Sequence, residues 1–134
     1  MAVSKPINYV VDCSVFTSFL LPDEKLATDF TSVFDKFLKH QINFLAPPIL
    51  KYEIGNVLKS SLNRKRITVQ EALEIFNAFL EFDIEYVTTN YSKTFQLSTK
   101  YNLTFYDASY LCLAQEKKAK LLTLDQKLLT CLPK

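Results

Sequence analysis

Short apolar segments alternate with longer amphipathic segments along the whole chain, and this alternation restricts the possible folds more than any other feature of the sequence. The segment INYVVD, residues 7–12, is rich in β-branched and apolar residues and ends at a carboxylate, which is typical of a buried strand. The amphipathic segments favour helices, because their apolar residues recur every three or four positions. Strands that alternate with helices are typical of an α/β domain with a parallel sheet.

The same patterns give the expected boundaries of each element. Strands are predicted at residues 7–12, 42–48, 84–87 and 119–124. Helices are predicted at residues 23–40, 49–66, 68–82, 92–101, 106–118 and 125–132. Leu26, Phe30 and Phe37 belong to the apolar face of the first helix, and Thr68 is the expected N-cap of the third. At 134 residues and without a repeat or linker, the chain is expected to form one domain over residues 1–134.

Composition excludes several classes of site. Lysine and arginine number 16 against 14 acidic residues, and the net charge of +2 is too small to indicate nucleic-acid binding by itself. Gly55 is the only glycine, which excludes the glycine-rich phosphate loops of Rossmann dinucleotide sites and P-loop NTPases. His40 is the only histidine, and Cys13, Cys112 and Cys131 show no CxxC spacing, so a zinc site is not expected. Metal chemistry in this chain would depend on carboxylates.

The N-terminal sequence MAVSKPINYVVD lacks the basic head and the long apolar region of a signal peptide. No apolar run approaches the roughly 20 residues that span a bilayer. We therefore expect a cytoplasmic protein without a membrane segment.

Acidic residues stand at the predicted carboxyl edge of the sheet, where ligands bind in open α/β folds. Asp12 ends the first strand, and Glu53 lies in the first turns of the helix after the second strand. Asp107 begins the helix of YDASYLCLA, and Asp125 follows the last strand. Carboxylates that converge without basic partners repel one another, and a hard divalent cation such as Mg²⁺ or Mn²⁺ removes that repulsion.

Each of these residues also has a local explanation that needs no ligand. Asp12 is able to form an Asx turn or to cap the next helix, and Asp107 forms a capping-box pattern with Thr104. Asp125 has the pattern of an N-cap, and Glu53 favours a helix N-terminus. Caps are far commoner than metal ligands, so only the convergence of all four residues favours a metal site.

Four segments carry a resemblance to a known family: VVDCSVF, LKYEIGNVL, LTFYDASYLCLA and KLLTLDQKLL. In order and spacing they resemble the four motifs of PIN-domain ribonucleases, and most of all those of the VapC toxin branch. The resemblance extends over essentially the whole chain. It implies a PIN-like, Rossmann-like parallel sheet of four or five strands, usually in the order 3-2-1-4-5, flanked by helices.

The resemblance also implies roles for individual residues. It implies an acidic quartet that binds Mg²⁺ or Mn²⁺ and is formed by Asp12, Glu53, Asp107 and Asp125. Ser14 and Thr123 match the hydroxyl positions that support the quartet. Cys13 is a departure, since a small alanine often stands at this place. The larger residue either changes only the packing or also makes the site sensitive to oxidation.

Three further features have two interpretations each. Asn56 shares a helix face with Glu53, and it either hydrogen-bonds a carboxylate or a metal-bound water or belongs to a solvated polar face. Tyr110 shares a face with Asp107, and it either stacks on a base or, as is commoner for aromatic residues, packs in the core. The basic run at residues 63–66 either binds phosphates or complements the dipole of the helix that it ends.

The sequence therefore predicts an endoribonuclease in which two or fewer cations activate water for attack on an RNA phosphodiester. For a toxin, the resemblance also implies an adjacent gene for a small antitoxin that blocks the acidic groove. The main alternative is a PIN-like module that has lost activity and only binds RNA or a protein, and the intact quartet argues against it. A receiver domain would need paired acids after the first strand, and a haloacid-dehalogenase phosphatase would need an acid where Ser14 stands.

The apolar content favours assembly into an oligomer. Hydrophobic residues make up 49% of the chain, and seven tyrosines and eleven phenylalanines supply more apolar area than one small core needs. Homodimers are also common in the family that the chain resembles. We expect a homodimer that forms through the helices before and after Arg66.

Overall fold

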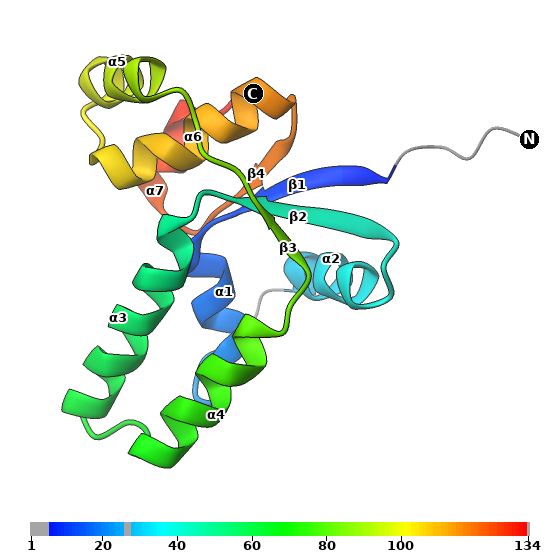
Figure 1. The fold of residues 1–134 in the computed structure, drawn as a ribbon, viewed down its shortest axis with the longest axis vertical. Coiled ribbons are helices and arrows are strands. Elements are labelled where there is room, and N and C mark those ends of the chain that lie inside the picture. The colour runs from blue at the N-terminus through cyan, green and yellow to red at the C-terminus, as the bar shows by residue number, and fades with distance from the viewer. Residues whose placement is uncertain (1–5, 26–27, 134) are drawn as a thin grey trace, which may run out of the picture.

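The computed structural model describes residues 6–25 and 28–133 of the chain. These residues form one parallel sheet of four strands with helices on both faces (Figure 1). The strands are β1 (Ile7–Val11), β2 (Ile42–Ala46), β3 (Ile84–Tyr86) and β4 (Lys120–Leu122). The α/β class and the parallel sheet that the alternation predicts are therefore confirmed.

The strands follow the order β3-β2-β1-β4, with β1 in the interior of the sheet. Tyr9 of β1 lies opposite Phe44 of β2 on one side and Lys120 of β4 on the other. This order agrees with the first four positions of the 3-2-1-4-5 order that the resemblance implies, and the described residues contain no fifth strand. Because all strands run in one direction, the residues that follow them meet at a single edge of the sheet.

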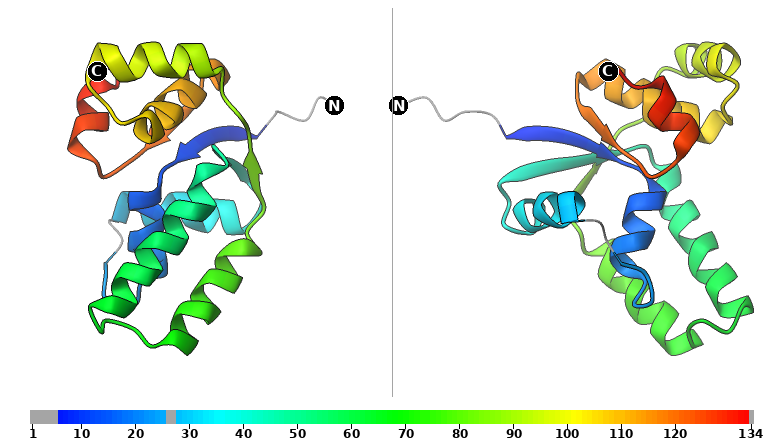
Figure 2. Two further views of the ribbon diagram at one scale, coloured as in Figure 1. Left: turned by 60° about the vertical axis from the view of Figure 1, so that its left-hand side comes forward. Right: turned by 180° about the vertical axis from the view of Figure 1, so that it is seen from behind.

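The described residues form seven helices: α1 (Cys13–Leu20), α2 (Thr28–Leu38), α3 (Ile49–Asn63), α4 (Val69–Leu80), α5 (Tyr91–Tyr101), α6 (Phe105–Lys117) and α7 (Gln126–Cys131). Figure 2 shows α1 to α4 on one side of the sheet and α5 to α7 on the other. Six of the helices correspond to predicted ones, and a capping box formed by Thr68 and Glu71 opens α4. No helix in the described ranges is long and apolar enough to cross a membrane.

Two helices differ from the predictions. α1 is absent from the predicted set because its sequence, CSVFTSFL, is dominated by residues of modest helix propensity. Packing of Val15 and Phe16 into the core stabilises this short helix. α2 begins at Thr28 rather than at residue 23, because residues 22–24 form a turn and a bend. Leu26, assigned above to the apolar face, lies outside the described residues.

Aromatic rings fill the space between the sheet and the helices α1, α2 and α4. Phe16 is fully buried, and its ring centroid lies 5.4 Å from that of Phe34, 5.8 Å from that of Phe44 and 5.5 Å from that of Phe79. All three contacts are edge to face, an arrangement that the ring quadrupoles favour. On the other side of the sheet, α6 is buried throughout residues 108–114. This core fixes α1 and α6 next to the carboxyl edge of the sheet.

Candidate active site

A pocket of about 410 Å³ lies at the carboxyl edge of the sheet. It is formed where β1 passes into α1 and β4 passes toward α7, and α3 and α6 contribute further side chains. The described residues that line it include no lysine or arginine and five acidic residues: Asp12, Glu24, Glu53, Asp107 and Asp125. All four members of the predicted quartet thus line one pocket. Glu24 is an addition to the prediction, because the sequence places it in a helix over residues 23–40, whereas it lies in an irregular segment before α2.

Asp12 is the most deeply buried of these carboxylates, with 5% of its surface exposed. Its backbone N–H donates to the carbonyl oxygen of Leu122 at 3.2 Å, which connects the end of β1 to β4. Its Oδ1 accepts a hydrogen bond from the backbone N–H of Val15 at 3.3 Å, so that Asp12 is the N-cap of α1. The capping interpretation of Asp12 is therefore correct, and the same side chain also lines the pocket.

Two hydroxyl groups orient the Asp12 carboxylate. Ser14 Oγ donates to Asp12 Oδ1 at 2.6 Å, and Thr123 Oγ1 donates to Asp12 Oδ2 at 2.5 Å. Each hydroxyl also accepts a backbone N–H at 2.9 Å, that of Leu124 for Ser14 and that of Asp125 for Thr123. This network joins the ends of β1 and β4, so Ser14 and Thr123 hold the carboxylate in place.

Glu53 is bound by a residue from a distant part of the chain. The hydroxyl group of Tyr110, on α6, donates to Glu53 Oε1 at 2.5 Å. The side chain of Tyr110 is buried, with 1% of the residue exposed, so core packing is the correct interpretation of its ring. Its hydroxyl nevertheless reaches the pocket. The sequence gives no sign of this contact, because the two residues lie 57 positions apart.

Asp107 and Asp125 both stand at helix N-termini but in different roles. Asp125 Oδ1 accepts the backbone N–H groups of Lys127 and Leu128 at 2.9 and 3.2 Å, which makes Asp125 the N-cap of α7 as its pattern suggests. The N-cap of α6 is Thr104, whose Oγ1 accepts the backbone N–H of Asp107 at 3.0 Å. Thr104 and Asp107 thus form the Thr104 half of the predicted capping box, and the Asp107 carboxylate lines the pocket.

The pocket favours the protonated form of three carboxyl groups. Burial raises the pKa of Asp12, and the charge of Asp107 adds to this effect, although hydrogen bonds to Asp12 oppose it. Burial also raises the pKa of Glu53 despite its bond with Tyr110, and Asp107 and Asp12 raise it further. The pKa of Asp107 is raised by burial and then by the charge of Asp125. Ionised carboxylates are therefore unfavourable here without a compensating positive charge.

Cys13 lines the pocket, and its thiol is held in the neutral state. Burial raises the pKa of Cys13 to about 12, and the neighbouring carboxylates add to the increase. Its Sγ lies 3.7 Å from Thr17 Oγ1. Because oxidants react with the thiolate rather than the thiol, the structure disfavours the oxidation sensitivity considered above.

The chemistry of the lining residues fits a hard divalent cation. They offer carboxylate and hydroxyl oxygens, which are the ligands that Mg²⁺ and Mn²⁺ prefer. As the side chains are placed, no three histidine, cysteine or acidic residues within the described ranges are grouped closely enough to hold a metal ion. Asp12 is engaged by Ser14 and Thr123, and Glu53 by Tyr110. A cation would have to draw these carboxylates together.

Two other predicted features lie outside the pocket. Asn56 is exposed and does not line it, which favours the solvated polar face. In the basic run at residues 63–66, Arg66 donates two hydrogen bonds to Asp23, at 2.7 and 2.8 Å, and lies 3.9 Å from Glu24. Arg66 is therefore paired with carboxylates just before α2.

The fold agrees with comparisons to known proteins. Residues 9–130 match the PIN domain family, and the chain belongs to this family. It is similar to Ribonuclease VapC3 of Pyrobaculum aerophilum, with 29% identity over 126 residues that cover 91% of this chain and 92% of the relative. Its fold is similar to that of PAE2754 from Pyrobaculum aerophilum, whose crystal structure gives a TM-score of 0.73 with 24% identity, covering 94% of this chain and 86% of that chain. The resemblance to VapC-like PIN-domain proteins is thus confirmed.

Proposed function

We propose that this protein is an endoribonuclease that hydrolyses RNA phosphodiester bonds with the help of Mg²⁺ or Mn²⁺. Its PIN domain and its similarity to Ribonuclease VapC3 support a hydrolase of the nuclease class. The single observation that carries the proposal is the convergence of four acidic residues on one pocket from separate segments, namely Asp12, Glu53, Asp107 and Asp125.

Capping explains only part of this convergence. It accounts for Asp12 at α1 and for Asp125 at α7. It does not account for Glu53, which lies inside α3, and for Asp107 it accounts for the backbone N–H that Thr104 accepts but not for a carboxylate in the pocket. Two carboxylates therefore line the pocket at an electrostatic cost that the fold does not require. This favours an active enzyme over the alternative, a PIN-like module that has lost activity and only binds RNA or a protein.

The side chains of the pocket are suited to different tasks. Asp12, fixed by Ser14 and Thr123, presents a carboxylate in one orientation, and we assign it as a direct metal ligand together with Asp107. Glu53 and Asp125 are assigned as ligands or as residues that position water. A bound divalent cation would lower the pKa of water and offset the negative charge on the phosphate.

Asp107→Asn tests the assignment most directly. The substitution keeps the size of the side chain and removes its charge, so we expect RNA cleavage to fall by orders of magnitude in a protein that still folds and binds RNA. Asp83→Asn is the matched control, because Asp83 is an exposed acid outside the pocket and its variant should cleave like the wild type. Cleavage by Asp107→Asn at the wild-type rate would contradict the proposal.

The products test the chemistry independently. Attack by water does not use the ribose 2′-hydroxyl, so the products should carry a 5′-phosphate and a 3′-hydroxyl. EDTA should abolish the activity, and Mg²⁺ or Mn²⁺ should restore it. Cyclic phosphates at the product ends would show that another mechanism operates.

We also propose that the protein is the toxin of a toxin-antitoxin pair. The similarity to Ribonuclease VapC3 supports this extension, and the partner would be a small protein encoded next to this chain's gene. Such an antitoxin should cover the acidic pocket and stop RNA cleavage when both proteins are co-expressed. Neighbouring reading frames that encode no such inhibitor would remove the basis for the pair.

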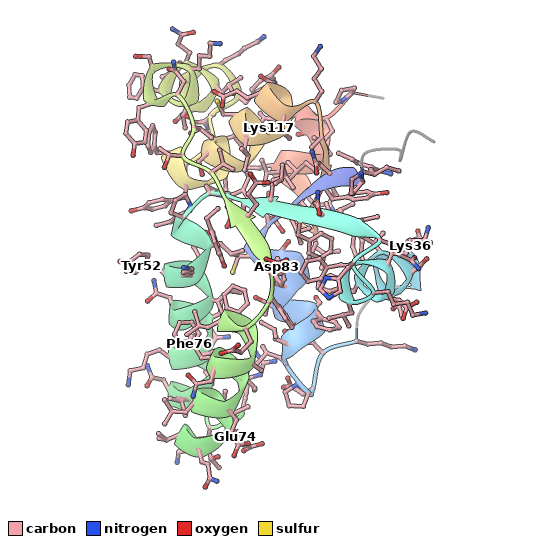
Figure 3. The ribbon with its side chains drawn as sticks, turned by 45° about the vertical axis from the view of Figure 1, so that its right-hand side comes forward. Lys36, Tyr52, Glu74, Phe76, Asp83 and Lys117 are labelled. Atoms are coloured by element: carbon pink, nitrogen blue, oxygen red, sulfur yellow. The ribbon has the colours of Figure 1, made fainter. Side chains whose placement is uncertain are left out.

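An exposed apolar face on α4 supports the homodimer. Val69, Leu73 and Leu80 are 64%, 58% and 45% exposed, and they recur at the spacing of a helix–helix seam. Tyr52 of the adjacent α3 points away from the molecule (Figure 3). Leu73→Glu should therefore convert a dimer to a monomer in light scattering, whereas Leu38→Glu, on the exposed end of α2, should not. A wild-type monomer at high micromolar concentration would contradict the prediction.

A further inference from the structure

Aromatic side chains gather on the surface of α5 and on the first turn of α6. Tyr91 and Phe95 of α5 are 68% and 62% exposed, and Phe105 and Tyr106 of α6 are 41% and 56% exposed. Figure 1 shows α5 lying beside α6 at one end of the molecule. These four residues form what we call the aromatic surface. Burial stabilises aromatic residues strongly, so several exposed rings at one place indicate a binding surface.

The aromatic surface contains two hollows. One of about 480 Å³ is lined by Tyr91, Phe95 and Phe105 together with Ser92 and Gln96. The other, of about 200 Å³, has Tyr91, Phe105 and Tyr106 in its wall. The rings of Tyr91 and Phe105 lie 6.3 Å apart between centroids and are inclined at 44°, so they are not stacked on each other. Tyr91 and Phe105 line both hollows, so a flat group that enters either hollow would meet these rings.

The smaller hollow lies next to the carboxylate pocket. Ile49 lines the hollow and Glu53, one turn later on α3, lines the pocket. On α6, Tyr106 lines the hollow and the next residue, Asp107, lines the pocket. The two sites are thus separated by about one helical turn, roughly 5 Å. If the scissile phosphate of an RNA strand lies in the pocket, the nucleotides next to that phosphate would lie at the aromatic surface.

The lysines of the neighbouring helices do not line the two hollows. Lys93 of α5 lines a separate hollow with Cys112 and Glu116, and Lys51 of α3 has its Nζ 4.4 Å from the ring centroid of Tyr86. Stacking rather than pairing with phosphates would therefore hold a strand at the aromatic surface.

We propose that the aromatic surface stacks unpaired bases of single-stranded RNA next to the cleavage point. This inference rests on the proposed ribonuclease function, which supplies the strand in the pocket. Stacking of bases on aromatic rings holds a single strand without reading its sequence, because every base has a π-face. The two hollows and the short distance to the pocket favour RNA over a second copy of the chain, which would need neither feature.

The test compares Tyr91→Ala and Phe95→Ala with Leu38→Ala, a matched loss of apolar area at the exposed end of α2. The probe is a fluorescently labelled single-stranded oligoribonucleotide of mixed sequence, bound in EDTA so that it is not cut, and its affinity is measured by anisotropy. Loss of one stacking ring should weaken binding at least about fivefold. An oligomer of the same length with abasic sites should bind the wild type and both ring variants with equal affinity. Leu38→Ala should bind both probes like the wild type.

Each result bears on a different statement. Unchanged RNA affinity in both ring variants would overturn the stacking inference, even if the wild type cleaves RNA as proposed. Ring variants that lose affinity for the RNA probe would support the inference even if the wild type cleaves no RNA, and only the proposed catalysis would then fail. A change of oligomeric state in sedimentation, with RNA affinity retained, would show that the surface joins two copies and would also overturn the inference. Melting temperatures of the variants confirm that the exposed substitutions leave the fold intact.

Discussion

Asp12 and Phe16 lie only four residues apart and are both buried, but they face regions of opposite character. Around Phe16, neutral aromatic rings pack edge to face in the core. Around Asp12, carboxylates raise one another's pKa values in a pocket whose described lining contains no basic residue. The aromatic core stabilises the fold, whereas the acidic pocket destabilises it until a positive charge binds.

The two regions are connected through α1. Burial of Val15 and Phe16 fixes this short helix against the core, and the helix in turn places the hydroxyl of Ser14 against Asp12. A site made of mutually repelling groups keeps its geometry only if the elements that carry it are rigid. The aromatic core therefore supplies the rigidity that keeps the acidic side chains in place.

Phe16→Ala tests how much the aromatic core stabilises the fold. Its ring is fully buried among Phe34, Phe44 and Phe79, so we expect the free energy of unfolding to fall by about 3–5 kcal/mol. Phe95→Ala removes the same ring from an exposed position and should change stability by no more than about 0.5 kcal/mol. Urea denaturation measures both values. A loss below about 1 kcal/mol in Phe16→Ala would show that α1 does not depend on the aromatic core.

Mn²⁺ binding tests how far the acidic pocket destabilises the metal-free protein. If the carboxylates bind the ion, a concentration of about a hundred times Kd should stabilise the wild type by about 2.7 kcal/mol. Asp12→Asn should abolish this effect and slightly stabilise the metal-free protein, because the pKa of Asp12 is raised on balance. The gain should be small, since asparagine offers a single oxygen where Ser14, Thr123 and the backbone of Val15 now donate. Thermal unfolding with and without Mn²⁺ measures both effects, and a Mn²⁺ shift that persists in Asp12→Asn would place the ion elsewhere.

The sequence predicts well those features that depend on local pattern or on the geometry of parallel strands. The N-cap at Thr68 follows from the local pattern, and the structure adds that Glu71 completes a capping box with it. The meeting of Asp12 and Asp125 at one pocket follows from the parallel direction of β1 and β4, which ends both strands at the same edge. The pattern of strands and helices also predicts Glu53 and Asp107 near this edge, and both residues line the pocket.

Features that depend on packing between distant segments do not follow from the sequence. The bond between Tyr110 and Glu53 exists because α6 and α3 both line the pocket, and no local pattern links them. Glu24 reaches the pocket from an irregular segment, where the sequence predicts the first turn of a helix. α1 is similar, because tertiary packing outweighs the modest helix propensity of its eight residues. Each of these features depends on a contact between distant segments, which local sequence propensities do not encode.

The pH dependence of stability should reveal the smallest difference between the two regions. A carboxyl group whose pKa is raised by folding holds its proton more tightly in the folded protein, so its contribution is fully present below the unfolded pKa and is lost as the pH rises through the folded pKa. Burial gives Asp12, Glu53 and Asp107 such raised pKa values, whereas the aromatic core contributes no titrating group. The metal-free protein should therefore gain stability from these three groups as the pH falls from neutral toward the ordinary values of 3.8 for Asp and 4.5 for Glu.

Asp23 acts in the opposite direction, because its bond with Arg66 lowers its pKa, and its contribution is lost only as the pH falls through that lowered value. Above about pH 4 the pocket should thus determine the difference between wild type and Asp12→Asn. Melting temperatures of the metal-free proteins between about pH 7 and pH 4 should rise more steeply with acidification in the wild type than in Asp12→Asn. Phe95→Ala, which leaves the pocket intact, should follow the wild-type slope. Parallel curves for wild type and Asp12→Asn would mean that Asp12 has the same pKa in the folded and unfolded chain. The acidic pocket would then not destabilise the fold through Asp12.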